Sequence, residues 1–183
     1  DELLAELLPP LETDGTSHLW EALGRKFTDM TYLEADLLSK RNKEFIKSLF
    51  PSENVYASLL PREAQDVIGK VGRETRGVEK MLRRIGFQYC NRIDPFDGGP
   101  HFRATTDEIL LVKRTRKPKV AEITDTPRGQ KSLVAVQLKE APFFRCTARP
   151  ATMLNDEAVA IDSATAAYLG VEVGSDVAVL PLD

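Results

Sequence analysis

Histidine, cysteine and long apolar runs are scarce in this chain of 183 residues. The two cysteines, Cys90 and Cys146, belong to no CxxC pair, so zinc-binding and redox motifs are unsupported, and isolated thiols fit a reducing cytoplasm. No apolar stretch approaches the roughly 20 residues that span a bilayer, and the first residues do not resemble a secretory signal. The sequence therefore predicts a cytoplasmic protein without a membrane segment, a metal or a permanently bound cofactor.

An excess of positive charge is also lacking. The 25 basic and 28 acidic side chains give a net charge of -3, which does not favour binding to a polyanion. One basic segment stands out, "LLVKRTRKPK" at Leu110–Lys119, but it contains no aromatic residues that could stack on bases. We expect a solvated linker or surface strand there, and no nucleic-acid partner.

Two kinds of periodicity divide the chain. Helical spacing dominates residues 1–101, where helices alternate with strands, whereas residues 102–183 contain short β runs separated by Pro and Gly. The pattern predicts an α+β protein: an α/β layer domain over residues 1–101, followed by a small all-β, barrel-like domain over residues 102–183.

Several helices are predicted in the first part. One follows the cap residue Ser17, and a second, continuous helix is expected over residues 31–50, ended by Pro51. The apolar positions expected to be buried along that second helix are Leu33, Leu37, Phe45, Ile46 and Leu49. A shorter helix is expected between Pro61 and Gly69.

The segment "TRGVEKMLRRIGFQYCNRI" predicts a compact helix and strand. Thr75 can cap the helix and Gly86 can end it, and residues 87–93 then alternate as a strand. The apolar stripe of this helix consists of Val78, Met81, Leu82 and Ile85. In the second part, a short helix is expected from Asp162 to Gly170, in a segment that resembles the closing part of double-psi β-barrels.

The segment "IDPFDGGPHF" at residues 93–102 admits two interpretations. Asp94 and Asp97 precede Pro and Gly, where aspartate commonly holds a turn through bonds to nearby N–H groups. Carboxylates also accept a guanidinium group in bidentate geometry. Gly98 and Gly99 can supply positive φ angles or a close approach of backbone to substrate, and His101 can transfer protons.

Several segments together carry a family resemblance. "LWEALGRKFTDMTYLEADLLS", "NKEFIKSLFP", "LLPREAQDVIGKVGRETRGVEKMLRRIGFQY" and "RIDPFDGGP" resemble, in order and spacing, the arginine N-succinyltransferase family, including its arginine/ornithine form, over about residues 1–115. The resemblance implies transfer of a succinyl group from succinyl-CoA, a co-substrate, to the α-amine of arginine in arginine catabolism. It also implies a GNAT-type N-acetyltransferase fold, present here as its later half, followed by a small β domain.

The sequence departs from the family at two places. No Gly-rich loop that would bind the CoA pyrophosphate is found, and the chain begins without Met at an apolar segment, Leu3–Leu8, that would be the strand after the CoA helix. We therefore expect a missing N-terminal half or a partner chain, and a homo- or hetero-oligomer that covers the sheet edge. Gly72 stands where the family places its proton-donating histidine, and glycine cannot transfer a proton.

Acyl transfer from a thioester to an amine needs a neutral amine, a stabilised oxyanion and an acid for the thiolate. The catalytic candidates are His18 and His101, and the substrate-binding candidates are Asp94, Asp97, Gly98 and Gly99. Two alternatives stay open: a non-catalytic or regulatory subunit of such an enzyme, and an acyltransferase with a different amine acceptor.

Overall fold

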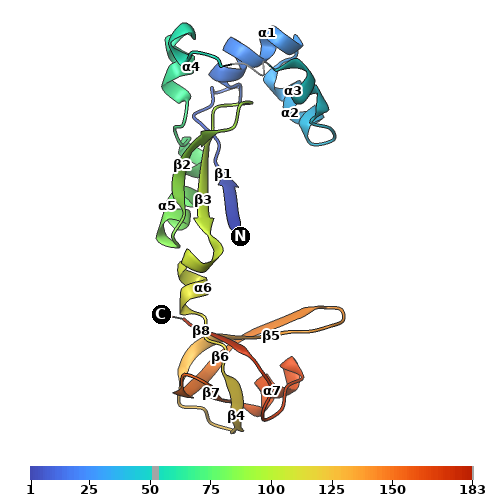
Figure 1. Ribbon diagram of the computed structural model, residues 1–183, viewed down its shortest axis with the longest axis vertical. Helices are drawn as coiled ribbons and strands as arrows, with labels where there is room; N and C mark the ends of the chain where they lie inside the picture. The colour runs from blue at the N-terminus through green and yellow to red at the C-terminus, as the bar shows by residue number, and fades with distance from the viewer. Residues whose placement is uncertain (51–53, 183) are drawn as a thin grey trace. The chain divides into compact units, whose positions relative to one another are not determined.

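The computed structural model describes residues 1–50 and 54–182, and the chain forms two compact units (Figure 1). The first unit is Asp1–Ile109 and the second begins at Leu110. Strand β3 (Pro100–Thr105) crosses the predicted division between residues 101 and 102. Because its Phe102 and Ala104 are buried in the core of the first unit, this whole strand belongs to that unit.

A three-stranded antiparallel sheet forms the centre of the first unit. Its order is β1 (Glu2–Glu6), β3 and β2 (Gln88–Ile93), so the strand latest in sequence lies in the middle. The register places Glu6 opposite His101, and Phe102 opposite Tyr89. The strand predicted at Leu3–Leu8 is observed at Glu2–Glu6 instead, and among the described residues it pairs with β3 alone.

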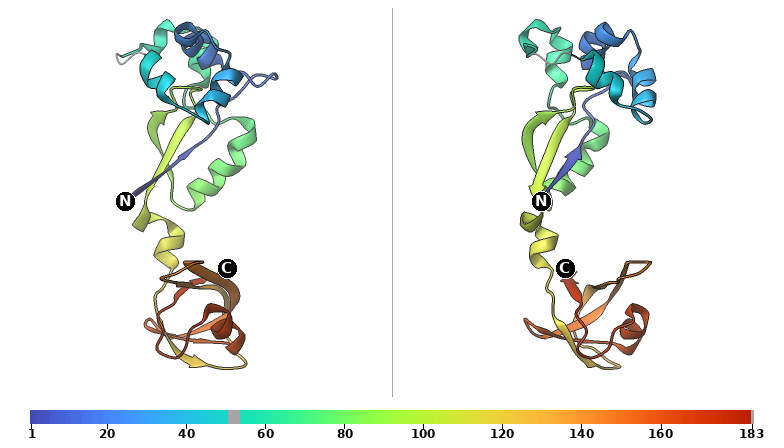
Figure 2. Two further views of the ribbon diagram at one scale, coloured as in Figure 1. Left: turned by 90° about the vertical axis from the view of Figure 1, so that its right-hand side faces the viewer. Right: turned by 45° about the vertical axis from the view of Figure 1, so that its right-hand side comes forward.

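Helix α5 (Arg76–Arg84) packs on one face of this sheet, as Figure 2 shows. Leu82 and Ile85 contact the cluster that includes Phe102. Gly86 follows the helix and has a φ of 109°. The predicted helix and strand are confirmed. The predicted stripe was too wide, since Val78 and Met81 are exposed and only Leu82 and Ile85 pack on the cluster. Thr75 occupies the cap position, but its hydroxyl donates to the carbonyl of Leu8 at 3.0 Å rather than capping the helix.

Short helices form the rest of the first unit. Their bounds are η1 (a π-helix, Trp20–Gly24), α1 (Arg25–Thr28), α2 (Tyr32–Ser39), α3 (Glu44–Leu49), η2 (Ala57–Leu59), α4 (Arg62–Val67), η3 (Arg73–Thr75) and η4 (Thr106–Glu108). Helices η1 and α2 and the turn before β3 form a second core of Trp20, Tyr32, Ala35 and Phe96, and Phe45 and Ile46 of α3 pack against it. Full burial of large side chains such as these contributes about 1.5–3 kcal/mol each.

The continuous helix predicted over residues 31–50 is wrong. Helices α2 and α3 are separate, and the side chain of Asn42 accepts a 2.7 Å hydrogen bond from the N–H of Glu44, where the second helix begins. Leu33 and Leu37 are exposed because α2 buries Tyr32 and Ala35 instead. The predicted stop at Pro51 lies outside the described residues.

The second unit contains α6 (Leu110–Arg114) and a five-stranded sheet of order β4-β7-β6-β5-β8. The strands are β4 (Lys119–Ile123), β5 (Gln130–Gln137), β6 (Phe144–Asn155), β7 (Ala158–Ile161) and β8 (Ala178–Pro181). Strands β4 and β7 run parallel and the other pairs antiparallel. Helix α7 (Ser163–Leu169) is capped by Asp162, which accepts from the N–H of Thr165, and ends at Gly170, as predicted.

The basic segment that begins the second unit is not a linker or strand in its first half. Leu110–Arg114 is helical, because Leu-Leu-Val-Lys-Arg contains no helix breaker and Pro118 follows only later. No helix in the described part of the chain combines the length and apolar character needed to cross a membrane.

Candidate functional site

The turn that joins β2 to β3 is closed by its own hydrogen bonds. The N–H of Asp94 donates to the carbonyl of Gly99, and the N–H of Gly98 donates to the carbonyl of Asp94, both at 2.8 Å. The carboxylate of Asp94 also accepts from the N–H of Phe96 at 2.7 Å. The predicted use of an aspartate to hold this turn is therefore observed, and the second oxygen of Asp94 stays outside that bond.

The backbone conformation or the packing of this turn requires glycine at both Gly98 and Gly99. Gly98 has a φ of 86°, which side chains rarely adopt, and its carbonyl accepts from the N–H of Gly69 at 2.9 Å. A Cβ atom at Gly99 would clash with the carbonyl oxygen of Leu7. The turn can therefore lie directly against the end of β1 and against the loop after α4.

Asp97 is buried, with 7% of its surface exposed. One carboxylate oxygen accepts from the N–H of Gly99 at 2.7 Å, and the other accepts from the hydroxyl of Tyr32 at 3.3 Å. Its carbonyl accepts from the hydroxyl of Ser17 at 3.1 Å. Both side-chain oxygens are thus engaged within the protein, so Asp97 fixes the turn against the helical region.

Burial raises the pKa of the Asp97 carboxyl to about 6. The hydrogen bond from Gly99 opposes this shift, the charge of nearby Asp94 adds to it, and the bond from Tyr32 also opposes it. Burial, followed by the charge of Asp97, raises the pKa of Tyr32 as well, so the phenol stays protonated and donates.

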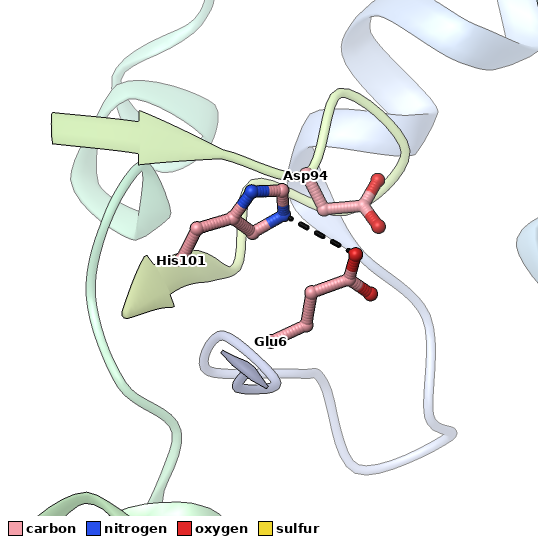
Figure 3. Close-up of side chains that lie close together, drawn as sticks. All are labelled: Glu6, Asp94 and His101. Carbon is pink, nitrogen blue, oxygen red and sulfur yellow. Dashed lines mark ion pairs between the residues drawn. The ribbon is translucent and has the colours of Figure 1, made fainter. Parts of the chain in front are cut away.

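Glu6, Asp94 and His101 come together in front of this turn (Figure 3). Glu6 and His101 lie opposite each other on β1 and β3, and Asp94 follows β2. Their ligand-type atoms all lie within 4.8 Å of one another, and Nε2 of His101 is 3.5 Å from a carboxylate oxygen of Glu6. That approach does not have hydrogen-bond geometry, so the buried Nε2 has no hydrogen-bond partner among the described residues. A lone pair or proton at this nitrogen therefore faces two carboxylates.

These three side chains line a pocket of about 510 Å³ within the first unit. The sequence singled out Asp94, Asp97 and His101 from this pocket but missed several others that line it, among them Glu6, Tyr32, Asp36, Lys40, Lys43 and Lys47. Local pattern could have placed Glu6 on a strand, but its pairing with His101 depends on a register between distant segments.

The lysines surround the junction of two helices: Lys40 follows α2, Lys43 precedes α3, and Lys47 lies in α3. Lys40 is paired with Asp36 at 2.7 Å, and Lys47 with Glu44 at 3.1 Å. Lys43 has no ion-pair partner in the part of the chain that the structure describes. Among the described residues that line the pocket, acidic groups therefore come from the sheet, the turn and α2, and Lys43 is the lysine without an ion-pair partner.

His18, the other predicted catalytic residue, lies elsewhere. It lines a separate hollow with Glu21, Lys26 and Pro61, and its Nε2 is 2.6 Å from a carboxylate oxygen of Glu12. The structure thus brings His101 together with Asp94 and Asp97 but does not bring His18 to them.

Gly72, which was expected to stand in place of a proton-donating histidine, packs against the chain after β1. Its N–H donates to the carbonyl of Leu8 at 2.7 Å, and a Cβ atom there would clash with the carbonyl of Pro9. The present backbone therefore has no space for any side chain at this position.

A metal ligand set is also present in principle. Imidazole and two carboxylates at Glu6, Asp94 and His101 are groups that bind divalent transition metals, although exposed acidic groups also occur commonly without one. The sequence predicted no metal here, and the same three groups can equally bind an organic cation.

Comparisons of the sequence with a family model and with curated proteins both match arginine N-succinyltransferases over the first unit. A family model described as "Arginine N-succinyltransferase beta subunit" matches residues 1–111. "Arginine N-succinyltransferase" of Escherichia coli O139:H28 is 37% identical over 123 residues, which cover 67% of this chain and 36% of that protein. The protein of the same name from Shigella boydii serotype 18 matches with the same values.

A solved structure extends the similarity to the second unit. The arginine/ornithine succinyltransferase subunit AI of Pseudomonas aeruginosa matches with a TM-score of 0.71 at 29% identity, over 99% of this chain and 51% of that one. The chain spans about a third of the length of the curated relatives. Because the family model covers more than half of the chain, the chain belongs to the arginine N-succinyltransferase beta subunit family.

Proposed function

We propose that this chain is the later part of an acyl-CoA-dependent N-acyltransferase that moves the succinyl group of succinyl-CoA to the α-amine of arginine, in arginine catabolism. Family membership and the names of the matched relatives support the reaction. The observation that carries the proposal in this chain is the buried Nε2 of His101, which has no hydrogen-bond partner among the described residues and lies near the carboxylates of Glu6 and Asp94 in the pocket.

The arrangement suits the first requirement of the reaction, a neutral amine. Glu6 and Asp94 attract the ammonium form of the acceptor, and His101 takes its proton. The amine then attacks the thioester carbonyl, the C–N bond forms, and the attacking nitrogen releases its second proton to solvent. The C–S bond then breaks, and CoA leaves as the thiolate. No side chain at Gly72 can protonate that thiolate, so the proton comes from another group or from water.

The other predicted site residues take supporting roles in this proposal. Asp94 stays a substrate-binding residue, for the amine rather than the guanidinium, because its carboxylate converges with Nε2 of His101. Asp97, Gly98 and Gly99 act through the turn that they hold. His18 lies outside the pocket, so the catalytic assignment rests on His101.

The fold proposal is a GNAT-type layer in the first unit and a barrel-like second unit. The support for the first is the order β1-β3-β2 with α5 on one face. The support for the second is a pair of isolated bridges, Arg116 with Val179 and Lys119 with Asp176, between the two edges of an otherwise open sheet.

The rest of the enzyme is proposed to supply the CoA site, on the same or on a partner chain. The edge of β1 that faces away from β3 is available for a further strand, and the family name refers to a subunit. We propose a homo- or hetero-oligomer on the same basis, and a cytoplasmic location because Cys90 and Cys146 are free thiols.

The test measures thiol release from succinyl-CoA and from acetyl-CoA, using a protein that contains this chain within the full length of its relatives or together with its partner. Arginine, ornithine and other amines are the acceptors. Release stimulated by arginine with succinyl-CoA supports the proposal. No stimulation by any amine would leave the second candidate, a non-catalytic or regulatory subunit, which the packing of Gly72 favours. Stimulation by another amine alone would identify a transferase with a different acceptor.

A further inference from the structure

The charged groups of the pocket are segregated. Glu6 and Asp94 lie at the end of the sheet and in the turn, whereas the lysines come from the region of α2 and α3. Once the internal pairs Lys40 with Asp36 and Lys47 with Glu44 are set aside, Lys43 is the cation without a partner among the described residues that line the pocket.

We propose that Lys43 binds the α-carboxylate of the acceptor and thereby makes the pocket selective for α-amino acids over amines without a carboxylate. The inference rests on the proposed function, since it assumes that this pocket takes the acceptor. It adds a specificity-determining residue that neither the sequence pattern nor the family match assigns.

The break between α2 and α3 explains why Lys43 is available. The side chain of Asn42 accepts a hydrogen bond from the N–H of Glu44, where α3 begins as a separate helix. Lys43 therefore lies at the junction of the two helices rather than inside one. Lysine carries three N–H donors on a flexible stem, and the exposed Lys43 can direct them toward an anion in the pocket.

The chemistry of an α-amino acid matches this polarity. Its amine and carboxylate are bonded to the same carbon, so a pocket with acidic groups for one and an ammonium for the other holds both in one orientation.

Three acceptor molecules distinguish the contribution of the α-carboxylate from those of the amine and the guanidinium. Arginine carries the amine, carboxylate and guanidinium. Agmatine, the decarboxylated form, lacks only the carboxylate, and arginine methyl ester retains the amine but has no carboxylate charge. In the complete protein we expect kcat/KM for arginine to exceed that for agmatine and for the ester by roughly tenfold or more, as for the loss of one charge-assisted contact.

The variant Lys43→Met tests the assignment. We expect it to lower kcat/KM for arginine by roughly tenfold, mainly through KM, and to leave agmatine and the ester unchanged, so that the preference disappears. Lys43→Arg should restore most of the preference. Lys26→Met is the matched control, because Lys26 lines the separate hollow beside His18. Equal loss for all three acceptors, or no change in their ratio, overturns the inference.

A direct binding measurement separates this inference from the proposed reaction. Arginine and agmatine are titrated into the same proteins by calorimetry without acyl-CoA. If arginine binds more tightly and Lys43→Met removes the difference while no thiol is released, the inference stands and the transferase proposal fails. If thiol is released but Lys43→Met changes neither binding nor kinetics, the transferase proposal stands and the inference about Lys43 fails. If neither acceptor binds and none reacts, both fail.

Discussion

The hydroxyl of Tyr32 donates a hydrogen bond of 3.3 Å to a carboxylate oxygen of Asp97, across 65 positions of the sequence. This bond joins helix α2 to the turn that precedes β3, and both residues line the proposed acceptor pocket. The position of the turn, and with it that of Asp94 and His101, therefore depends on a contact that local sequence does not specify.

Tyr32→Phe should lower the free energy of unfolding by about 1–3 kcal/mol, because the buried carboxylate of Asp97 loses a donor that the phenyl ring cannot replace. Urea unfolding at neutral pH measures the change. Tyr56→Phe is the control and should fall within about 0.5 kcal/mol of the unmodified protein, since Tyr56 is exposed. Equal effects of the two substitutions would contradict a stabilising role for the Tyr32 bond.

The pKa of Asp97 predicts a pH dependence of stability. Its carboxyl has a pKa of about 6 in the folded protein, against about 3.9 in an unfolded chain, so the folded state holds the proton more tightly. Ionisation of Asp97 therefore costs stability, and its contribution to the free energy of unfolding falls by about 1–3 kcal/mol as the pH rises from about 4 to above 6.

The variant Asp97→Asn isolates this contribution, because the amide does not titrate. Chemical unfolding of both proteins from pH 4 to 7 should show a difference that changes through that window, with the unmodified protein losing stability relative to the variant as the pH rises. A constant difference across the window would show that the carboxyl does not have a raised pKa.

A side chain introduced at Gly72, including the histidine that the sequence resemblance implies there, should destabilise the protein. Gly72→Ala and Gly72→His both place a Cβ against the carbonyl of Pro9, and we expect a loss of about 1–3 kcal/mol unless the backbone moves. Gly77→Ala is the matched control: Gly77 lies in α5 with open space at its Cβ position, and alanine there should stabilise by about 0.5–1 kcal/mol. Thermal unfolding of the three variants gives the comparison, and a neutral or stabilising Gly72→Ala would show that the segment after β1 adapts.

His101→Gln should reduce kcat for arginine by about a hundredfold or more, because the amide cannot take the proton of the amine. Circular dichroism checks that the variant folds, and calorimetry checks that arginine still binds. His18→Gln provides the comparison and should keep kcat within about twofold, since His18 lies outside the pocket. If His18→Gln causes the large loss instead, the catalytic assignment passes to that residue.

Local sequence determined the helix ends, caps and turns, because these depend on residues close together in the chain. The helix that ends at Gly86 and leads into β2 and the Asp162 cap of α7 were predicted correctly, because a positive φ or a side chain bonded to a nearby N–H suffices to specify each of them. Of the two interpretations left open for Asp94 and Asp97, the structure shows the hydrogen bonds of the turn. The resemblance to the arginine N-succinyltransferase family was likewise visible in the order of short motifs, and the family match confirmed it.

Tertiary structure decided what depends on distant segments. The antiparallel register of β1 and β3 places Glu6 beside His101. No local pattern predicts which residues of two strands far apart in the sequence will lie opposite each other. The apolar periodicity of residues 31–50 predicted one helix, whereas packing of Tyr32 against Phe96 and Asp97 turned α2 to bury a different face, and α3 began separately at Asn42 and Glu44. The sequence could thus name Asp94 and His101 as candidates, but only folding brought Glu6, Tyr32 and Lys43 into the same pocket, because burial and pairing act between residues that the chain order keeps apart.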